Sequence, residues 1–261
     1  MSTFRLATLN VHVFNSPKNG KNNINDLISV LEPLNLDLIA VQEINNNDRW
    51  RTFCQRLSLP NFIYGQGDQH QLGNGLASRY PIDFYSNQQS YFPCRGGTRG
   101  LLKCRLKGDH PFTKDRIFAV THLDHIHEDN RLQQIRDFSP HSENIDILMG
   151  DMNALTKDDY SDGYYRKQVV EMRESFQREK PRFDLTKLLT DEWKYHDAFK
   201  LRNPQVKDEL IATCPYGTRV DYIYIRPRDN DQWFLSECSI IDTNGETDHN
   251  AVFAEFKLKL K

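Results

Sequence analysis

The stretch that decides the fold is Ile145-Asp-Ile-Leu-Met-Gly-Asp-Met-Asn153, an apolar run that ends in polar side chains. Its first five residues, Ile145 to Met149, predict a strand. The Ile-Leu-Met run is apolar on both faces, as expected for a strand that is covered on both sides. Asp151 and Asn153 follow two residues apart, so in an extended chain they project to the same side. The stretch therefore predicts a buried strand that delivers a carboxylate and an amide to one place.

The same pattern, an apolar run bordered by polar residues, recurs along the chain. Predicted strands at residues 5–9, 36–41 and 117–120 lead into Asn10, Glu43 and His122, residues 220–225 contain Asp221, and Asp248 and His249 precede residues 251–260. A carboxylate placed after Leu-Ile-Ala-Val is costly unless it meets solvent, a partner or a metal. Any one of these endings is an ordinary transition from strand to loop. Together they predict a site built at the strand ends of a layered sheet.

Helical periodicity fills several of the gaps between these strands. Apolar residues at helical spacing predict helices over 24–31, 50–57 and after Glu128, and a longer charged helix over about Tyr164–Glu179, based on Val169, Met172 and Phe176. Asn74-Gly75 predicts a turn, and the alternation over residues 251–260 predicts a half-exposed strand. Strands and helices in this mixture indicate an α/β or α+β layered architecture. No linker interrupts the sequence, so we expect one domain spanning residues 1–261.

The charge balance excludes a strongly basic nucleic-acid-binding protein. The chain has 34 Lys and Arg against 36 Asp and Glu, with a formal net charge of −2. A phosphate-bearing substrate must then be attracted locally or through a bound metal. No stretch approaches the twenty apolar residues of a membrane span, and no secretory signal is evident. We therefore expect no stable association with a membrane. The 5 cysteines form no CxxC pair, which favours a reduced, intracellular protein in the cytoplasm or nucleus.

The polar residue types fit the hydrolysis of a phosphodiester. That reaction needs a hard divalent cation, a base for the attacking water and donors for the non-bridging oxygens. A carboxylate such as Glu43 suits Mg²⁺. Asp151 can accept a proton while Asn153 donates an amide hydrogen bond to the substrate. His122 and His249 can bind phosphate as imidazolium or act as acids.

An ordered set of motifs now makes the sequence familiar. The motifs are TLN (8–10), LDLIAVQE (36–43), GLASRYPI (75–82), THLDH (121–125), GDMNA (150–154), RVDYIYI (219–225) and TDHNAV (247–252). In this order the chain resembles the endonuclease/exonuclease/phosphatase superfamily, also called deoxyribonuclease I-like. The resemblance implies a four-layer α/β/β/α sandwich, in which two β-sheets pack face to face and helices cover both outer faces. It covers nearly the whole chain.

The resemblance also implies roles for these residues. Glu43 would be the principal ligand of Mg²⁺, for which Mn²⁺ would substitute, and Asn10 and Asp248 would contact the metal or the phosphate. Catalysis would rest on Asp151, Asn153, His122, His249, Asp221 and Asn10. Asp151 would orient or deprotonate the attacking water, and Asn153 would hold that geometry. Asp221 would hydrogen-bond one of the two histidines, and the motif alone does not say which.

A Gly/Arg stretch at residues 94–101 is the local basic cluster of the first half of the chain. One interpretation is a hairpin loop with solvated arginines. The other is a substrate-facing loop in which Arg95 or Arg99 contacts phosphate and Tyr91 or Phe92 lines a pocket or stacks on a base. The spacing of His125 and His127 fits no zinc motif, so we interpret both as residues at the rim of the site.

Three hypotheses about function follow. The first is a Mg²⁺-dependent phosphodiesterase acting on nucleic acid, either a nuclease or a DNA-end-processing enzyme, which we expect to be a monomer. The second keeps the fold but acts on a phospholipid or phosphoinositide, or resembles a sphingomyelinase; GDMNAL and PYGTRVDYI lack the signature residues of inositol polyphosphate 5-phosphatases. The third is a non-catalytic binding module, against which the intact set of ligands argues.

Overall fold

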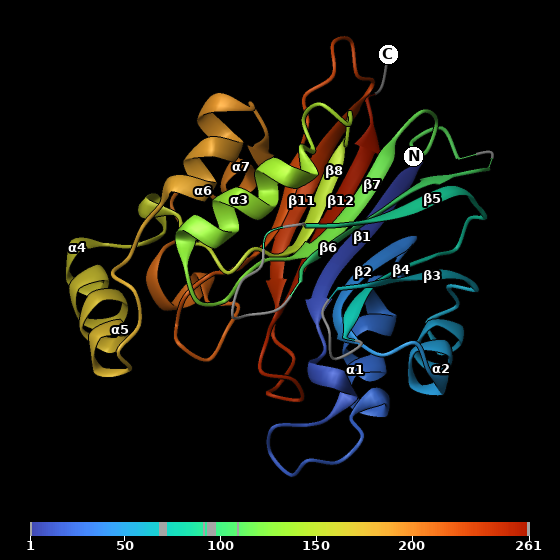
Figure 1. Cartoon of the computed structure of the whole chain (residues 1–261). Helices are drawn as coiled ribbons and strands as arrows, with labels where there is room; N and C mark the ends of the chain where they lie inside the picture. The colour runs from blue at the N-terminus through green and yellow to red at the C-terminus, as the bar shows by residue number, and fades with distance from the viewer. Residues whose placement is uncertain (1, 68–71, 91, 93–97, 109, 260–261) are drawn as a thin grey trace.

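Two β-sheets packed face to face form the centre of the molecule (Figure 1). The structure is a computed structural model that describes residues 2–67, 72–90, 92, 98–108 and 110–259. Each sheet has six strands, and helices cover the outer faces. The α/β/β/α sandwich predicted from the sequence is therefore confirmed. Within the described residues, no helix is both long and apolar enough to cross a lipid bilayer.

The first sheet combines strands from both ends of the chain. Its strand order is β11-β12-β1-β2-β4-β3, and only β1 and β2 run parallel. The bounds are β1 Thr3–Asn10, β2 Leu38–Ile44, β3 Asn61–Gln66, β4 Gly73–Ser78, β11 Trp233–Ile241 and β12 Ala251–Leu258.

The second sheet comes from the middle of the chain. Its order is β5-β6-β7-β8-β10-β9, and β7 and β8 form its parallel pair. The bounds are β5 Ile82–Gln89, β6 Gly100–Leu106, β7 Ile117–His122, β8 Ile147–Asp151, β9 His196–Asp197 and β10 Asp221–Ile225. Across the interface between the sheets, β1 faces β8 and β10, and β2 faces β7 and β8. The two parallel pairs therefore lie against each other.

Helices α1 and α2 cover the first sheet, whereas α3 and α6 cover the second (Figure 1). The α-helices are α1 Ile24–Leu31, α2 Asp48–Arg56, α3 Glu128–Phe138, α4 Asp162–Tyr164, α5 Met172–Ser175, α6 Asp184–Lys187 and α7 Ala198–Arg202. Two π-helical turns, Tyr165–Glu171 and Leu188–Glu192, continue α4 and α6. Short 3₁₀ turns lie at His12–Phe14, Glu32–Leu34, Lys157–Asp159 and Asp208–Ile211.

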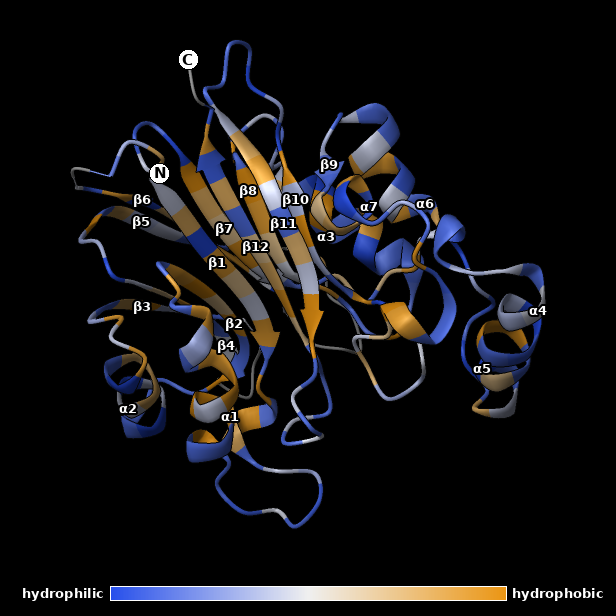
Figure 2. Ribbon diagram, turned by 180° about the vertical axis from the view of Figure 1, so that it is seen from behind, coloured by the Kyte–Doolittle hydropathy of each residue, from blue (hydrophilic) through white to orange (hydrophobic). Residues whose placement is uncertain are grey.

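Alternation along the central strands explains the layers. In β1, Leu6 faces the core between the sheets, whereas Ala7 faces the helices α1 and α2. In β8, Met149 faces the same central core, and Leu148 faces α3. The hydropathy colouring shows the strands as the most continuous apolar part of the molecule (Figure 2). These strands are apolar on both faces because both faces are covered.

Three local predictions are wrong. Asn74-Gly75 is not a turn but lies within β4, where a Cβ on Gly75 would come within 2.5 Å of Trp50 Cζ2. Glycine is needed there because the indole ring packs directly against the strand. The helix predicted over Tyr164–Glu179 is present as a continuous run of α4, the π-helical turn and α5, but it ends at Ser175, so Phe176 lies beyond it, 59% exposed, and is not one of its inward residues.

The third wrong prediction is the half-exposed strand over residues 251–260. β12 ends at Leu258, and its residues 251–256 are buried on both faces. It lies between β11 and β1, and its one buried carboxylate, Glu255, pairs with Arg5 Nε at 2.8 Å. The alternation of charged residues therefore reflects one buried ion pair and an exposed strand end.

Candidate active site

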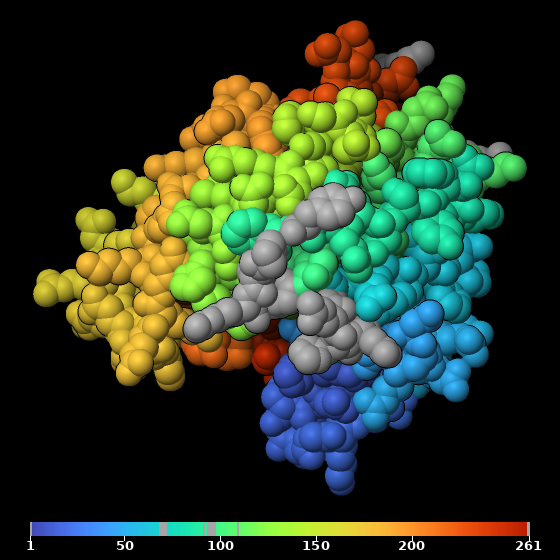
Figure 3. All heavy atoms as spheres, viewed as in Figure 1, coloured from blue at the N-terminus to red at the C-terminus, as the bar shows by residue number. Residues whose placement is uncertain are grey.

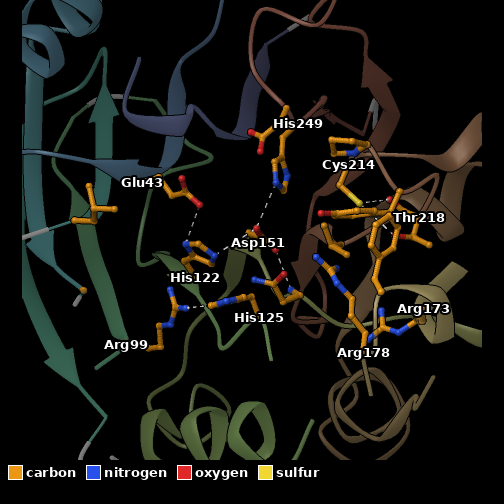
Figure 4. A pocket seen from close by; sticks show the side chains of 18 of the residues that line it. Glu43, Arg99, His122, His125, Asp151, Arg173, Arg178, Cys214, Thr218 and His249 are labelled. Carbon is orange, nitrogen blue, oxygen red and sulfur yellow. Dashed lines mark hydrogen bonds and ion pairs between the residues drawn. The ribbon is translucent and has the colours of Figure 1, made fainter. Parts of the chain in front are cut away.

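The predicted site residues come together where the parallel strands of the two sheets end. Asn10 and Glu43 are delivered by β1 and β2, and His122 and Asp151 by β7 and β8. Because the two parallel pairs face each other, their carboxyl ends meet at one edge of the sandwich. Glu43, His122 and Asp151 border a cavity of about 610 Å³, which Asn153, Asp248 and His249 also line (Figure 4).

A β-bulge turns the carboxylate of Glu43 toward this cavity. The pairing of β2 with β4 shifts between Val41 and Ile44, and Glu43 has a φ of 58°. Such a bulge changes the direction in which a side chain leaves the strand. Asn10 Nδ2 donates to Glu43 Oε1 at 2.9 Å. The nearby arginines are occupied elsewhere, since Arg49 binds Val13 O and Asn15, and Arg51 binds Asp48.

The carboxylate of Asp151 lies among three nitrogen-bearing side chains. Its Oδ2 lies 3.3 Å from Asn10 Nδ2, 3.5 Å from His122 Nε2 and 3.8 Å from His249 Nε2. Strand pairing explains the arrangement, because Asp151 is directly opposite His122 on β7 and Asp221 on β10. Side chains of paired residues project from the same face of a sheet. Asp151 is thereby held between a histidine and a second carboxylate.

His249 is the histidine that pairs with Asp221. Its Nδ1 lies 2.8 Å from Asp221 Oδ2, which leaves Nε2 directed toward Asp151. This contact resolves the alternative that the motif left open. Although burial opposes it, the charge of Asp221 and the hydrogen bond with it hold the pKa of His249 well above its usual value. His249 is therefore an imidazolium at neutral pH.

Asp151 and His122 are shifted in ways that follow from their burial. Burial and the neighbouring charge of Asp221 raise the pKa of Asp151 to about 7, although His249 acts against the shift. Burial and the charge of Arg99 lower the pKa of His122 to about 3, despite the proximity of Glu43. At neutral pH, His122 is consequently a neutral hydrogen-bonding group, and Asp151 titrates in the range suited to a general base.

Asn153 is fixed by its backbone as well as by its side chain. Its N–H donates to Asp151 Oδ1 at 2.9 Å, and its φ is 50°. Its Nδ2 donates to Leu123 O at 3.1 Å. Asparagine is one of the residues that tolerate this left-handed conformation. The residue therefore orients Asp151, and it lines the cavity beside it.

The oxygen-rich group around Glu43 fits a hard divalent cation. Both Glu43 Oε2 and Asp248 Oδ2 lie near one imidazole atom, His12 Nδ1, at 3.5 and 3.8 Å. Burial alone would raise the pKa of Glu43, but hydrogen bonds with His12 and Asn10 hold it well below its usual range. The two carboxylate groups beside this imidazole offer the oxygen ligands that Mg²⁺ or Mn²⁺ prefers.

The amide of Asn10 is less free to bind a metal than the sequence prediction assumes. Its Nδ2 donates to Glu43 and Asp151, while its Oδ1 accepts from the N–H of His12 at 3.1 Å. Asp151, Asp221 and His249 also offer one possible ligand atom each, and these three atoms lie within 4.8 Å of one another. There the hydrogen bond between His249 and Asp221 already uses two of the groups, so the site at Glu43 and Asp248 suits a cation better.

The two arginines predicted to bind substrate differ in what the structure says of them. Arg99 lines the cavity and is only 8% exposed, so it is not a solvated loop arginine. Its Nη2 lies 3.2 Å from His125 Nδ1, and His125 also lines the cavity. Arg95 lies outside the described residues. His127 has a largely exposed ring and sits outside the cavity at the start of α3.

Several residues of the candidate site were not predicted from the sequence. His12 lies in a left-handed turn directly after β1, and it follows the TLN motif so closely that its position is a usable signal. Arg173, Arg178, Cys214 and Tyr216 line the opposite side of the cavity. They come from the irregular segments after α4 and before β10, where no periodicity predicts what a side chain will face.

Comparison with known proteins agrees with this geometry. Residues 7–236 match the model of the Endonuclease/Exonuclease/phosphatase family, and the chain belongs to that family. Its fold is thus that of a phosphoesterase, in a family that generally depends on divalent metals. A comparison with curated protein sequences finds no match.

Solved structures share the fold at low sequence identity. An endonuclease/exonuclease/phosphatase from Beutenbergia cavernae matches with a TM-score of 0.73 and 15% identity, covering 99% of this chain and 72% of that one. A D. rerio TDP2 humanized by 14 mutations matches with a TM-score of 0.63 and 15% identity over 98% and 100% of the two chains. The mannosyl-6-phosphatase Bt3783 of Bacteroides thetaiotaomicron has a TM-score of 0.60 and 14% identity, with coverage of 98% and 100%.

Proposed function

We propose that the protein is a divalent-metal-dependent phosphodiesterase that hydrolyses nucleic acid, with Asp151 as the base for the attacking water. One observation carries the proposal. A carboxylate with its pKa raised to about 7 lies within 3.8 Å of an imidazolium held by Asp221. A base and a positive donor side by side are what the attack of water on a phosphate anion requires.

The side chains divide the work as follows. Asp151 accepts a proton from the water, and Asn153 and Asn10 keep its oxygens in place through their N–H groups. His249 donates from Nε2 to a phosphoryl oxygen and balances its added negative charge. His122, neutral, contributes a further hydrogen bond. Glu43 and Asp248 would hold Mg²⁺ or Mn²⁺, which supplies Lewis acidity to the phosphate when bound.

Nicking of supercoiled plasmid in the presence of Mg²⁺ tests this proposal directly. The wild type is compared with Asp151→Ala and with a control, Asp158→Ala, whose carboxylate is exposed nearby. We expect nicking by the wild type and the control, and none by Asp151→Ala or after chelation. Equal nicking by Asp151→Ala would contradict the assigned role. Absence of nicking by all three proteins would count against DNA and direct the assay to RNA and to small or lipid phosphate esters.

The second candidate is a phosphatase of small phosphate esters. The observation that favours it is the cavity itself, because about 610 Å³ matches sites that enclose one small ligand. One structural neighbour is by name a mannosyl-6-phosphatase. Release of inorganic phosphate from sugar phosphates without plasmid nicking would favour this alternative. A lipid substrate, a monomeric state and an intracellular location stay predictions; co-sedimentation with liposomes tests the first.

A further inference from the structure

Three arginines line the cavity without a carboxylate partner. Arg99, Arg173 and Arg178 all border it, and none forms an ion pair with another residue of the described chain. The acid closest in sequence to Arg178, Glu179, pairs instead with Arg131 and Arg182, both at 3.6 Å. In contrast, His249, which also lines the cavity, is paired with the carboxylate of Asp221.

Arg99 shows most clearly that a partner is missing. It is more than nine-tenths buried, and its Nε has no hydrogen-bond partner among the described residues. Its neighbour at 3.2 Å is the ring of His125. A buried guanidinium is costly unless it is paired and hydrogen-bonded. Since no described side chain supplies the negative charge, an anion entering the cavity is the natural partner.

Arg173 and Arg178 extend this positive surface across the cavity wall. The turn after α5 brings them together, because Arg178 N–H donates to Arg173 O at 2.8 Å. Arg173 Nε donates to the backbone oxygen of Glu179 at 3.0 Å, and the guanidinium of Arg178 lies over the ring of Tyr216 at 4.1 Å. These contacts hold both arginines in position while leaving further N–H donors free of carboxylates.

The three arginines are spread along the cavity wall, with Arg99 on one side of His125 and Arg178 and Arg173 on the other. In Figure 4, Arg99, His125, Arg178 and Arg173 follow one another along the side of the cavity below Asp151. Burial and the charges of Arg99 and Arg178 lower the pKa of His125, which agrees with its place between the two. The phosphate to be cleaved would lie against His122 and His249, beside Asp151. The arginines are therefore available to bind a second phosphate group.

We infer that Arg99, Arg173 and Arg178 form a second anion subsite, which binds a phosphate adjacent to the one that is hydrolysed. The inference rests on the proposed function, and it narrows the substrate to nucleic acids and nucleotides that carry at least two phosphates. Guanidinium groups are the donors best suited to phosphate oxygens. In a nucleic-acid strand each phosphodiester has such a neighbouring phosphate, whereas a simple sugar phosphate has none.

A matched pair of chromogenic substrates isolates the subsite. Thymidine 5′-(p-nitrophenyl phosphate) is compared with the same compound bearing a 3′-phosphate, both with Mg²⁺. We expect wild type to have the higher kcat/KM for the 3′-phosphorylated compound, mainly through a lower KM. Arg178→Gln should reduce that preference by about ten- to a hundredfold, since a charge-assisted hydrogen bond is lost. Arg173→Gln serves as a second variant if Arg178→Gln does not fold.

Arg166→Gln is the control variant. Arg166 belongs to the same segment, is 82% exposed in its side chain and pairs with Glu171 outside the cavity. It should leave the preference for the 3′-phosphate unchanged. Equal kcat/KM values for the two substrates in wild type would overturn the inference. So would an equal loss with Arg166→Gln and Arg178→Gln.

Binding separates failure of the inference from failure of the proposed function. If wild type cleaves neither compound, calorimetry compares thymidine 3′,5′-bisphosphate with thymidine 5′-monophosphate. Tighter binding of the bisphosphate that is lost in Arg178→Gln would support the subsite, although the proposed function would fail. Equal affinity for the two nucleotides would overturn the subsite itself.

Discussion

Replacing Asp221 by Asn removes the charge that keeps His249 protonated while preserving the shape of the side chain. Asp221 is fully buried and accepts from His249 Nδ1 at 2.8 Å. An asparagine oxygen can still accept that hydrogen bond, so the ring should stay in place. A hydrogen bond to a charged group contributes about 1.5–3 kcal/mol and a neutral one about 0.5–1.5 kcal/mol, so the substitution loses about 1–1.5 kcal/mol. At 1.36 kcal/mol per factor of ten, kcat/KM should fall about 5- to 13-fold where both proteins carry the imidazolium.

The size of this loss should depend on pH in a defined direction. In the wild type the pKa of His249 lies well above its usual value because of Asp221, so the imidazolium persists at neutral and mildly alkaline pH. Without that charge, burial lowers the pKa, and the variant loses its proton at lower pH than the wild type. The ratio of wild-type to variant activity should therefore be smallest near pH 5.5 and grow toward pH 8.

Removal of the charge acts on Asp151 as well. The negative charge of Asp221 is, after burial, the second cause of the raised pKa of Asp151. In Asp221→Asn that pKa should fall, and the acidic limb of the pH profile should move to lower pH. The acidic and the alkaline limb of the pH profile thus both move to lower pH. The shift of the acidic limb reports on Asp151, and that of the alkaline limb reports on His249.

The assay is hydrolysis of bis(p-nitrophenyl) phosphate with saturating Mg²⁺ from pH 5.5 to 9. The exposed Asp158→Asn is the matched control, and thermal unfolding confirms that each variant is folded. Wild-type and Asp221→Asn rates within twofold of each other at pH 8 would refute the reasoning. A loss independent of pH would show that Asp221 positions the ring without setting its charge.

Three further predictions follow from the site and the packing. Glu43→Gln should weaken Mn²⁺ binding at least about tenfold in calorimetry because a charged ligand is lost, and unchanged affinity would place the metal elsewhere. Arg219→Met should lower the free energy of unfolding in urea by about 3–5 kcal/mol, because Asp197 would be left buried without its ion-pair partner and Asp159 would keep only Lys200, and a cost below 1 kcal/mol would contradict this. Gly75→Ala should cost about 1–3 kcal/mol from overlap with Trp50, whereas Gly163→Ala, with open space around it, should be tolerated.

The polar residues at the strand ends could be predicted from the sequence because a strand buried on both faces needs a continuous apolar run. A run such as Leu-Ile-Ala-Val can be apolar on both faces only inside a covered sheet, and a carboxylate beside it must face a cavity. That logic places Glu43 and Asp151 without knowledge of the rest of the chain. It also explains why one ambiguity remained, since the partner of Asp221 depends on how β10 and the loop before β12 approach each other.

The side chains on the opposite wall of the cavity could not be predicted from the sequence, because no periodic pattern fixes their direction. Arg173 lies on α5 and Arg178 follows the turn after it, in a part of the chain that projects from the side of the molecule as the yellow atoms in Figure 3 show. Their direction depends on a turn and on contacts with Tyr216, and neither leaves a pattern in the sequence. The error at Asn74-Gly75 has a similar origin: local turn chemistry was outweighed by the need to seat Trp50 against the strand.

The pairing of β1 with β12 makes assembly of the site depend on both ends of the domain having been synthesised. Phe4 on the first described strand lies opposite Phe256 on the last, and Asp248 and His249 directly precede that strand. On the ribosome, β1 must keep an unpaired edge until β12 has emerged, and contacts so distant in sequence also form slowly. We expect a nascent chain to be catalytically silent. Under the proposed function, hydrolysis would begin only once β12 has paired with β1.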